Sequence, residues 1–251
     1  MTDVKPPKYF IRFSQDADFD KISDFYDLNS HKNVLKRQTE LMKQLTEDGA
    51  VVIVEDEKGK IVAASITYAH SAKDEHGVEH IKWQELGTTR CVLNGYPGLF
   101  DAMIAMQTLR AFLVEPPDNM FVAQMETTPV QNLAKKLGWR ELGGDPSDDM
   151  LEAKKKTVTH GHATKNDWYV CGMEALPTMA KWMENAVDNP VVTNKKTGEQ
   201  IELDFSKSSF FNMFKDEIKN LANRDFGDVN TPDKNQNMHQ RRDKWLKKFF
   251  R

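Results

Sequence analysis

The chain has 251 residues, which is enough to bury a sizeable core in one domain with an appendage or in two small domains. A formal net charge of −3 gives no general reason to expect binding to nucleic acid or membranes, and without an apolar leader or a membrane-length apolar run we expect a soluble cytoplasmic protein. The two cysteines, Cys91 and Cys171, stand in apolar strand-like surroundings and are interpreted as reduced core thiols.

The first part of the chain predicts a sheet built from hairpins. Strands are expected at Tyr9–Phe13, Ala50–Val54, Ile61–Tyr68 and Ile81–Leu93. One helix is expected to begin with Asp16 as its N-cap, and a second to span about Asn33–Thr46. Glu57–Lys60 has the composition of a hairpin turn, and Ser71–Gly77 that of a polar loop.

A mixed sheet is predicted once the next elements are added. After a methionine-rich helix that stops before Glu115, Met120–Met125 is expected to form a strand. Thr128–Gln131 opens another helix with a capping-box pattern, and Gly138 ends it. Early hairpins and later crossover helices imply an α/β fold whose mixed sheet is mostly antiparallel, with a parallel part near the turn that follows Leu93.

The C-terminal third predicts both helices and strands. Asp167–Cys171 is strand-like and Glu174–Val187 is an amphipathic helix. Val191–Thr193 and Ile201–Phe205 form an expected hairpin, and Ser208 caps a helix. The chain ends in a basic helix with Trp245, Phe249 and Phe250, which either contacts acidic lipid, nucleic acid or an acidic protein, or docks on the body through its aromatic side chains.

A candidate small-molecule site lies where the strand ending at Leu93 enters the turn Asn94–Gly98 and then a helix. A strand that passes through a glycine-containing turn into a helix directs several backbone N–H groups to one place. The turn therefore favours an anion or a polar tail of a ligand.

These elements resemble those of the GCN5-related N-acetyltransferase (GNAT) family over about Lys8–Leu142, with Asp167–Cys171 as a last strand. The resemblance is carried by the element order, by Glu85-Leu86 and Arg90-Cys91-Val92 before the glycine turn, and by Ala134–Trp139. It implies a GNAT-like mixed sheet flanked by helices in residues 1–172, followed by a C-terminal α+β extension in residues 173–251.

The resemblance implies an acyltransferase that moves an acetyl or longer acyl group from a thioester to an amine on a small molecule or a protein. Acetyl-CoA or another acyl-CoA would be the donor, and no metal is required. Glu85 resembles the family's central-strand glutamate and would take the proton of the amine; the alternative is a strand-end carboxylate paired with Arg90 or solvent. Arg90 would hold a carboxylate or phosphate of the substrate, or make an ordinary ion pair.

The donor would lie along the end of this strand. The backbone of Cys91, Val92 and Leu93 would pair with the pantetheine chain as an added strand would. The phosphopantetheine end would lie in the turn, which is formed by Asn94, Gly95, Tyr96 and Gly98.

Three features depart from the family. The phosphate loop is usually Q/R-x-x-G-x-G/A, whereas the loop here is shorter, lacks the basic residue and contains Pro97, which has no N–H. Asp101 in the first helical turn would repel a phosphate. Where the family often has a tyrosine as general acid, spacing from Gly138 gives Ala134; Tyr96 and Tyr169 are the candidate substitutes.

The resemblance and these departures together leave two possible functions. The first is an acyltransferase, with an acyl carrier protein as a possible donor, since residues 85–90 have a distant similarity to acyl-homoserine lactone synthases. The second is a catalytically inactive GNAT-like module for ligand or protein binding. His160 and His162 lack further ligands nearby and do not predict a metal site, and Met103 and Met106 fit a core better than an acyl pocket.

Overall fold

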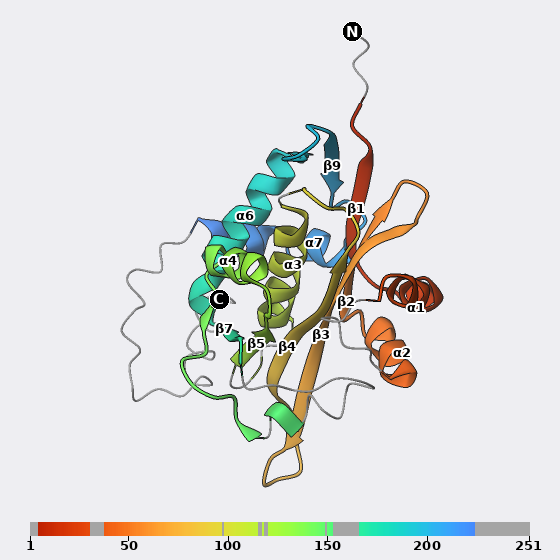
Figure 1. Cartoon of the computed structure of the whole chain (residues 1–251). Helices are drawn as coiled ribbons and strands as arrows, with labels where there is room; N and C mark the ends of the chain where they lie inside the picture. The colour runs from red at the N-terminus through yellow and green to blue at the C-terminus, as the bar shows by residue number, and fades with distance from the viewer. Residues whose placement is uncertain are drawn as a thin grey trace.

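The computed structural model describes residues 5–30, 38–96, 98–114, 117, 120–148, 150–152 and 166–223. Within these ranges nine strands form one mixed sheet (Figure 1). They are β1 (Lys8–Phe13), β2 (Val51–Asp56), β3 (Ile61–Lys73), β4 (Glu79–Cys91), β5 (Met120–Gln124), β6 (Arg140–Glu141), β7 (Trp168–Cys171), β8 (Val191–Thr193) and β9 (Gln200–Asp204). Their order across the sheet is β6-β7-β5-β4-β3-β2-β1-β9-β8, and only the β4–β5 and β1–β9 pairs are parallel.

Helices cover both faces of the sheet. The α-helices are α1 (Phe19–Leu28), α2 (Thr39–Glu47), α3 (Leu99–Leu113), α4 (Thr128–Lys136), α6 (Leu176–Asp188), α7 (Ser209–Met213) and α8 (Lys215–Ala222), with short 3-10 turns η1 (Asp16–Asp18) and η2 (Met173–Ala175). In Figure 1, α1 and α2 lie on one side of the sheet, and α3, α4 and α6 on the other. The predicted mixed, mostly antiparallel sheet flanked by helices is confirmed.

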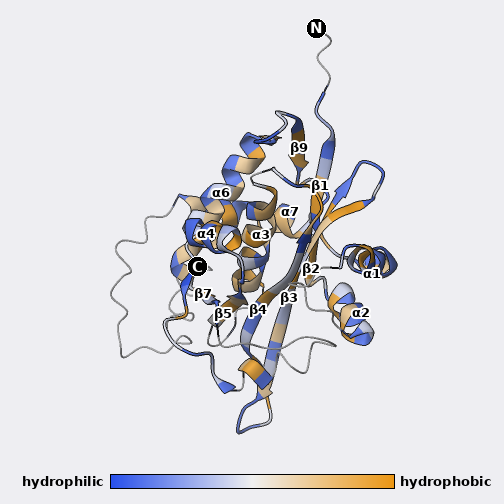
Figure 2. Cartoon of the chain, in the orientation of Figure 1, coloured by the Kyte–Doolittle hydropathy of each residue, from blue (hydrophilic) through white to orange (hydrophobic). Residues whose placement is uncertain are grey.

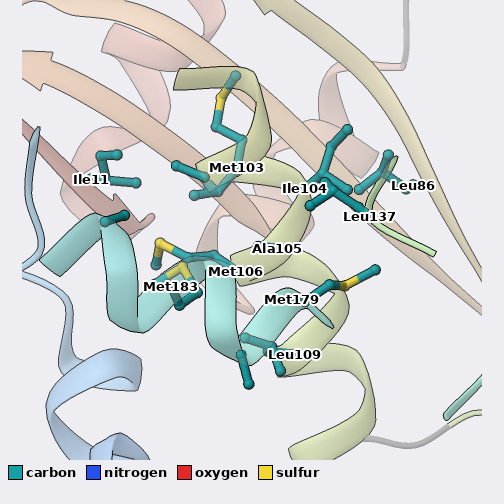
Figure 3. Close-up of a cluster of buried hydrophobic side chains, with 14 of the residues drawn as sticks. Ile11, Leu86, Met103, Ile104, Ala105, Met106, Leu109, Leu137, Met179 and Met183 are labelled. Atoms are coloured by element: carbon teal, nitrogen blue, oxygen red, sulfur yellow. The ribbon is translucent and has the colours of Figure 1, made fainter. Parts of the chain in front are cut away.

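The larger core lies on the side of α3. This helix is apolar on most of its surface because the sheet covers one side of it and α6 another, so Met103, Met106 and Leu109 are all fully buried. Figure 3 shows Met179 and Met183 of α6 beside Met106 and Leu109. Met103 and Met106 are therefore core residues, as predicted. A second cluster, with Ile22 and Phe25 of α1, covers the opposite face.

The loop expected at Ser71–Gly77 is shorter in the structure, and its first residues belong to a strand. Strand β3 runs on to Lys73 and β4 begins at Glu79, so the two strands form one long hairpin. Its tip is hydrophilic (Figure 2), because it projects beyond the core. Asp74 closes the turn, since its Oδ1 accepts from the backbone N–H groups of His76 and Val78, both at 2.9 Å. The polar composition reflected solvent exposure, which a strand tolerates when its backbone is paired.

Two expected helix caps are also wrong. Asp16 begins the 3-10 turn η1, and the helix α1 follows from Phe19. At α4 the N-cap is Thr127, which makes no side-chain capping bond. The predicted capping-box partner Gln131 donates instead to the carbonyl of Met125, at 2.7 Å. Gly138 does end α4, with a left-handed φ of 92°.

A buried ion network joins the first strand to the helix that follows it. Arg12 on β1 binds both oxygens of Asp18, at 2.6 and 2.9 Å, and both oxygens of Glu55 on β2, at 3.1 and 3.3 Å. Lys207 adds a contact of 3.1 Å to Glu55. Burial would raise the pKa of Asp18 and of Glu55, but the hydrogen bonds from Arg12 outweigh it and hold both pKa values below their usual range.

The C-terminal extension continues the same sheet. Strand β9 pairs in parallel with β1, with Tyr9 opposite Leu203, and β8 pairs with β9 at the edge. Helix α6 packs on α3, and both helices contribute to one hydrophobic cluster. This arrangement brings the hairpin of β8 and β9 to the end of the sheet where β4 passes into α3 (Figure 1).

Several predictions fall on residues that the structure does not describe: the beginning of the helix expected at Asn33–Thr46, the pair His160 and His162, and the basic C-terminal helix. In the described part of the chain, no group of three or more histidine, cysteine or acidic residues is arranged to hold a metal ion. None of the helices there has the length and apolar character needed to cross a bilayer.

Candidate active site between β4 and β5

The candidate site lies where two parallel strands separate. Strand β5 pairs with β4 from Trp83, opposite Met120, to Leu86, opposite Ala123. Beyond Leu86, β4 continues to Cys91 with β3 as its partner, while β5 ends at Gln124. The backbone of β4 from Gly87 onward is therefore an edge within the interior of the sheet, and such an edge can pair with an extended ligand.

A β-bulge in β4 explains the separation. The β3–β4 register shifts between Ala64 and Ile66, opposite Thr88, which has a left-handed φ of 50°. The Oη of Tyr26 donates to the carbonyl of Thr88 at 2.6 Å, and the hydroxyls of Tyr68 and Thr88 lie 2.7 Å apart. Bulges bend a strand and increase its twist. This bulge turns the end of β4 away from β5, and two tyrosine hydroxyls hold it in place.

A cavity of about 430 Å³ occupies the gap. This volume is within the range of sites that enclose small ligands, about 300–1,000 Å³. Most of the predicted site residues line it: Glu85, Arg90, Cys91, Leu93, Asn94, Gly95 and Tyr96. Val92 and Gly98 are outside the lining; Val92 packs on the core and Gly98 is the N-cap of α3. The far wall comes from Ala123 to Thr127 and from Val130.

Glu85 lies in the wall of the cavity and is almost fully buried, with 1% of its surface exposed. It is not at the end of its strand or open to solvent, as the alternative prediction would have it. Its Oε2 is 3.8 Å from Nε2 of His70 on β3. The His70 ring stacks on Trp83, with ring centroids 3.7 Å apart. A buried carboxylate at a cavity, next to a group that can carry a proton, can take part in proton transfer.

Arg90 and Cys91 line the cavity with half-buried side chains. Among the residues that the structure describes, none forms an ion pair or hydrogen bond with the guanidinium of Arg90. Cys91 is a cavity residue, and the prediction of a core thiol holds only for the buried Cys171. Burial raises the pKa of the Cys91 thiol, and its Sγ donates to the carbonyl of Leu93 at 3.3 Å. A neutral thiol of this kind is a poor nucleophile.

The backbone at the end of β4 is oriented for pairing. The N–H of Val92 donates to the carbonyl of Val62 at 2.9 Å, so this peptide faces β3. Because successive residues of a strand alternate in direction, the N–H and C=O of Cys91 face the open edge. An extended chain that carries amide groups can bind there by backbone hydrogen bonds.

The turn after β4 relies on glycine. Gly95 and Gly98 have φ values of 87° and 97°, which favour glycine. Asp101 in the first turn of α3 is buried, but Lys136 of α4 lies 3.1 Å from its Oδ2 and balances its charge. The repulsion of a phosphate that we expected from Asp101 is therefore reduced.

The three positions considered for a proton donor differ in their surroundings. Tyr96 lines the cavity. Tyr169 is buried in the core under Lys135, whose Nζ is 5.6 Å from the ring centroid. Ala134 is also in the core, and α4 presents Val130 to the cavity instead. Of the two candidate tyrosines, Tyr96 is the one that could donate a proton to a ligand there.

Sequence reasoning did not identify His70 or the tyrosines that hold the bulge. A signal for His70 existed: Tyr68 and His70 alternate on β3 as Trp83 and Glu85 do on β4, and antiparallel pairing places all four on one face. This signal was missed because the strand was expected to end at Tyr68, before the loop predicted at Ser71–Gly77. The bulge at Thr88 had no comparable signal, because threonine is an ordinary strand residue.

No family model matches the sequence, and no curated protein matches it either. Solved structures that are similar include a phosphinothricin acetyltransferase from Sinorhizobium meliloti in complex with AcCoA, 14% identical over 64% of this chain and 86% of that chain, with a TM-score of 0.46. A polyamine N-acetyltransferase from Drosophila melanogaster is 11% identical, over 66% of this chain and all of that chain, with a TM-score of 0.43. A ribosomal-protein-alanine N-acetyltransferase from Brucella melitensis is 14% identical, over 64% and 94%, with a TM-score of 0.42. Likeness at this level transfers no activity to the chain.

Proposed function

We propose that the chain is a GNAT-like acyltransferase that moves an acetyl or longer acyl group from a CoA or carrier-protein thioester to an amine. The observation that supports this most is the cavity between β4 and β5, which begins where the two strands stop pairing after Leu86. The open backbone edge at Cys91 suits the amide groups of a pantetheine arm. The glycine turn at the end of the same cavity suits its phosphate end.

The residues of the cavity have distinct roles in this proposal. Glu85 takes a proton from the protonated amine, directly or through water, because only the neutral amine is a nucleophile. The amine nitrogen then forms a bond to the thioester carbonyl carbon, and the carbon–sulfur bond breaks. The departing thiolate receives its proton from Tyr96 or from water. Arg90 binds a carboxylate or phosphate of a substrate.

A second candidate function is ligand or partner binding without catalysis. The observation in its favour is that α4 presents Val130 to the cavity and buries Ala134 in the core, so neither residue can protonate a thiolate. The two functions differ in a measurable way. A binding module would bind an acyl-CoA but release no free thiol with any amine of a broad panel.

Binding of the donor is tested by thermal unfolding. Acetyl-CoA at about 100 times its dissociation constant is expected to stabilise the folded chain by about 2.7 kcal/mol. For a chain of this size that is a rise in melting temperature of about 5–10 °C. Longer acyl-CoAs are measured in parallel. Unchanged melting with every acyl-CoA at millimolar concentration would argue against a CoA thioester as donor.

A pair of tryptophan variants on α4 locates the binding. Val130→Trp is expected to fill part of the cavity and remove most of the shift, since Val130 lines it. Asn132→Trp is the matched control, because Asn132 is exposed on the same helix and outside the lining. The control is expected to keep the full shift. Equal shifts in both variants would mean that the ligand binds elsewhere.

A further inference from the structure

The hairpin turn between β8 and β9 is docked on the turn that follows β4. The side-chain amide of Asn194 donates from Nδ2 to the carbonyl of Asn94 at 2.9 Å. The backbone N–H of Lys195 donates to the carbonyl of Gly95 at 3.0 Å. Asn194 and Asn94 are separated by 100 positions in the sequence. The extension is thus part of the structure that holds the cavity turn.

The side chain of Asn194 is buried and makes hydrogen bonds to both turns. It is 6% exposed, and its Oδ1 accepts from the N–H groups of Lys196 at 2.9 Å and Thr197 at 3.2 Å. The oxygen therefore holds the hairpin turn in shape, while the nitrogen of the same amide reaches the cavity turn. One planar group connects the two turns.

The close approach also accounts for Gly95. A Cβ at this position would lie 2.6 Å from Oδ1 of Asn194, which is closer than atoms can pack. Gly98 also lies close to the extension: a Cβ there would be 3.6 Å from Trp182 of α6 and 3.8 Å from Val192 of β8. The cavity turn is therefore fitted against the extension along its length.

The contact with the hairpin orients the backbone N–H groups of the turn that follows β4. In a planar trans peptide the C=O and N–H point in opposite directions. The hairpin binds the carbonyls of Asn94 and Gly95, so the N–H groups of Gly95 and Tyr96 point away from the hairpin. Both residues line the cavity, and among the described residues no hydrogen bond engages either N–H. Two exposed lysines of the hairpin turn, Lys195 and Lys196, favour an anionic ligand nearby.

We infer that Asn194 is a positioning residue for the donor subsite: it holds the cavity turn so that the N–H groups of Gly95 and Tyr96 bind the phosphate at the end of a phosphopantetheine arm. This inference rests on the proposed function. The turn lacks the basic residue of the usual phosphate loop. In this inference the C-terminal hairpin supports phosphate binding instead, by holding the N–H groups of the turn in position. The same phosphate occurs in acyl-CoA and in acylated carrier proteins.

The test is Asn194→Asp with three donors: acetyl-CoA, an acetylated carrier protein, and acetyl-pantetheine, which has no phosphate. Aspartate keeps the oxygen that holds the hairpin turn but loses the Nδ2–H donor to Asn94. Binding of a phosphate-bearing donor is expected to weaken about tenfold, the upper end for one hydrogen bond. Binding of acetyl-pantetheine is expected to stay within about twofold. The phosphate-bearing donor that loses affinity identifies the source of the phosphate.

Asn212→Asp is the matched control. Asn212 is exposed and donates from Nδ2 to the carbonyl of Ser206 at 2.9 Å, so the substitution has the same chemistry away from the cavity. It is expected to leave all three affinities unchanged. Equal loss of all donors in Asn194→Asp, or no loss of any, would overturn the positioning role. If the unmodified protein binds none of the donors, the proposed function fails and the inference fails with it.

A measurement on the unmodified protein covers the case in which Asn194→Asp does not fold. The amide N–H signals of Gly95 and Tyr96 are followed by NMR during titration. Acetyl-CoA is expected to shift both signals and slow their exchange with solvent, and acetyl-pantetheine to leave them nearly unchanged. Signals that respond equally to both ligands would overturn the assignment of these N–H groups to a phosphate.

Discussion

Glu85→Gln is expected to lower the rate of acyl transfer by about 100-fold or more, with donor affinity unchanged. Glutamine has nearly the same size and keeps one of the two acceptor oxygens, but it cannot accept a proton from an ammonium group. Glu85 lines the cavity and is nearly fully buried, so the substitution acts within the candidate site. Release of free thiol at saturating amine measures the rate, and calorimetry with acetyl-CoA measures the affinity.

Glu79→Gln is the control for this substitution. Glu79 is exposed on the same strand, at the far end of the long hairpin, so the change in charge is the same but the cavity is not touched. It is expected to behave like the unmodified protein. Unaltered turnover in Glu85→Gln would reject the base assignment, whereas lost donor affinity would mean that Glu85 has a binding role.

Arg12→Met is expected to lower the free energy of unfolding by about 3–5 kcal/mol, the usual cost of removing one partner from a buried ion pair. Arg12 binds two carboxylates through four short contacts, and neither Asp18 nor Glu55 is exposed to solvent. Without the guanidinium, the partners that remain among the described residues are the N–H of Gln15 for Asp18 and Lys207 for Glu55. Urea unfolding measures the change. Lys43→Met, which removes an exposed contact of 3.9 Å to Glu47, is expected to change stability little.

The pH dependence of stability provides a second readout of the same network. The pKa values of Asp18 and Glu55 are lower in the folded state than in the unfolded chain. Their contribution is therefore complete above about pH 4–5 and is lost as the pH falls toward the folded-state values. In Arg12→Met burial is no longer outweighed at Asp18, so its pKa is expected to rise above the usual value. The variant is then expected to gain stability on mild acidification, where the unmodified protein does not. The same pH dependence in both proteins would contradict this account of the network.

Much of the fold follows from local patterns. Three local signals indicate the conformation of their own segments: the continuous apolar run Ala50–Val54, the turn residues at Glu57–Lys60 and the proline at the beginning of α4. The order of these elements favoured a mixed sheet, because parallel strands such as β4 and β5 need a long crossover connection, which is usually a helix. The capping residues were less informative: the expected cap, Asp16, begins the turn η1, and the side chain of Asp18, the N-cap of α1, accepts from Arg12 and from the N–H of Gln15.

The arrangement of the site depends on contacts between distant segments. The sequence places Glu85, Arg90 and the turn after Leu93 in one strand and loop, but it does not show that β4 and β5 separate after Leu86. That separation depends on the bulge at Thr88, whose carbonyl is held by Tyr26 from α1. The sequence also does not show that His70 lies beside Glu85. That contact follows from the register of the β3–β4 hairpin.

The sequence by itself determined most of the elements, their order and the residues of one strand and turn, because backbone preference and hydrophobic period are properties of neighbouring residues. The tertiary structure alone decided that the hairpin after α6 joins β1 and that Asn194 lies against Gly95. Contacts of this kind depend on strand register and on which sheet edge is left unpaired, and both are set by the packing of the whole chain. For that reason the candidate cavity and its support by the C-terminal hairpin could be described only from the folded molecule.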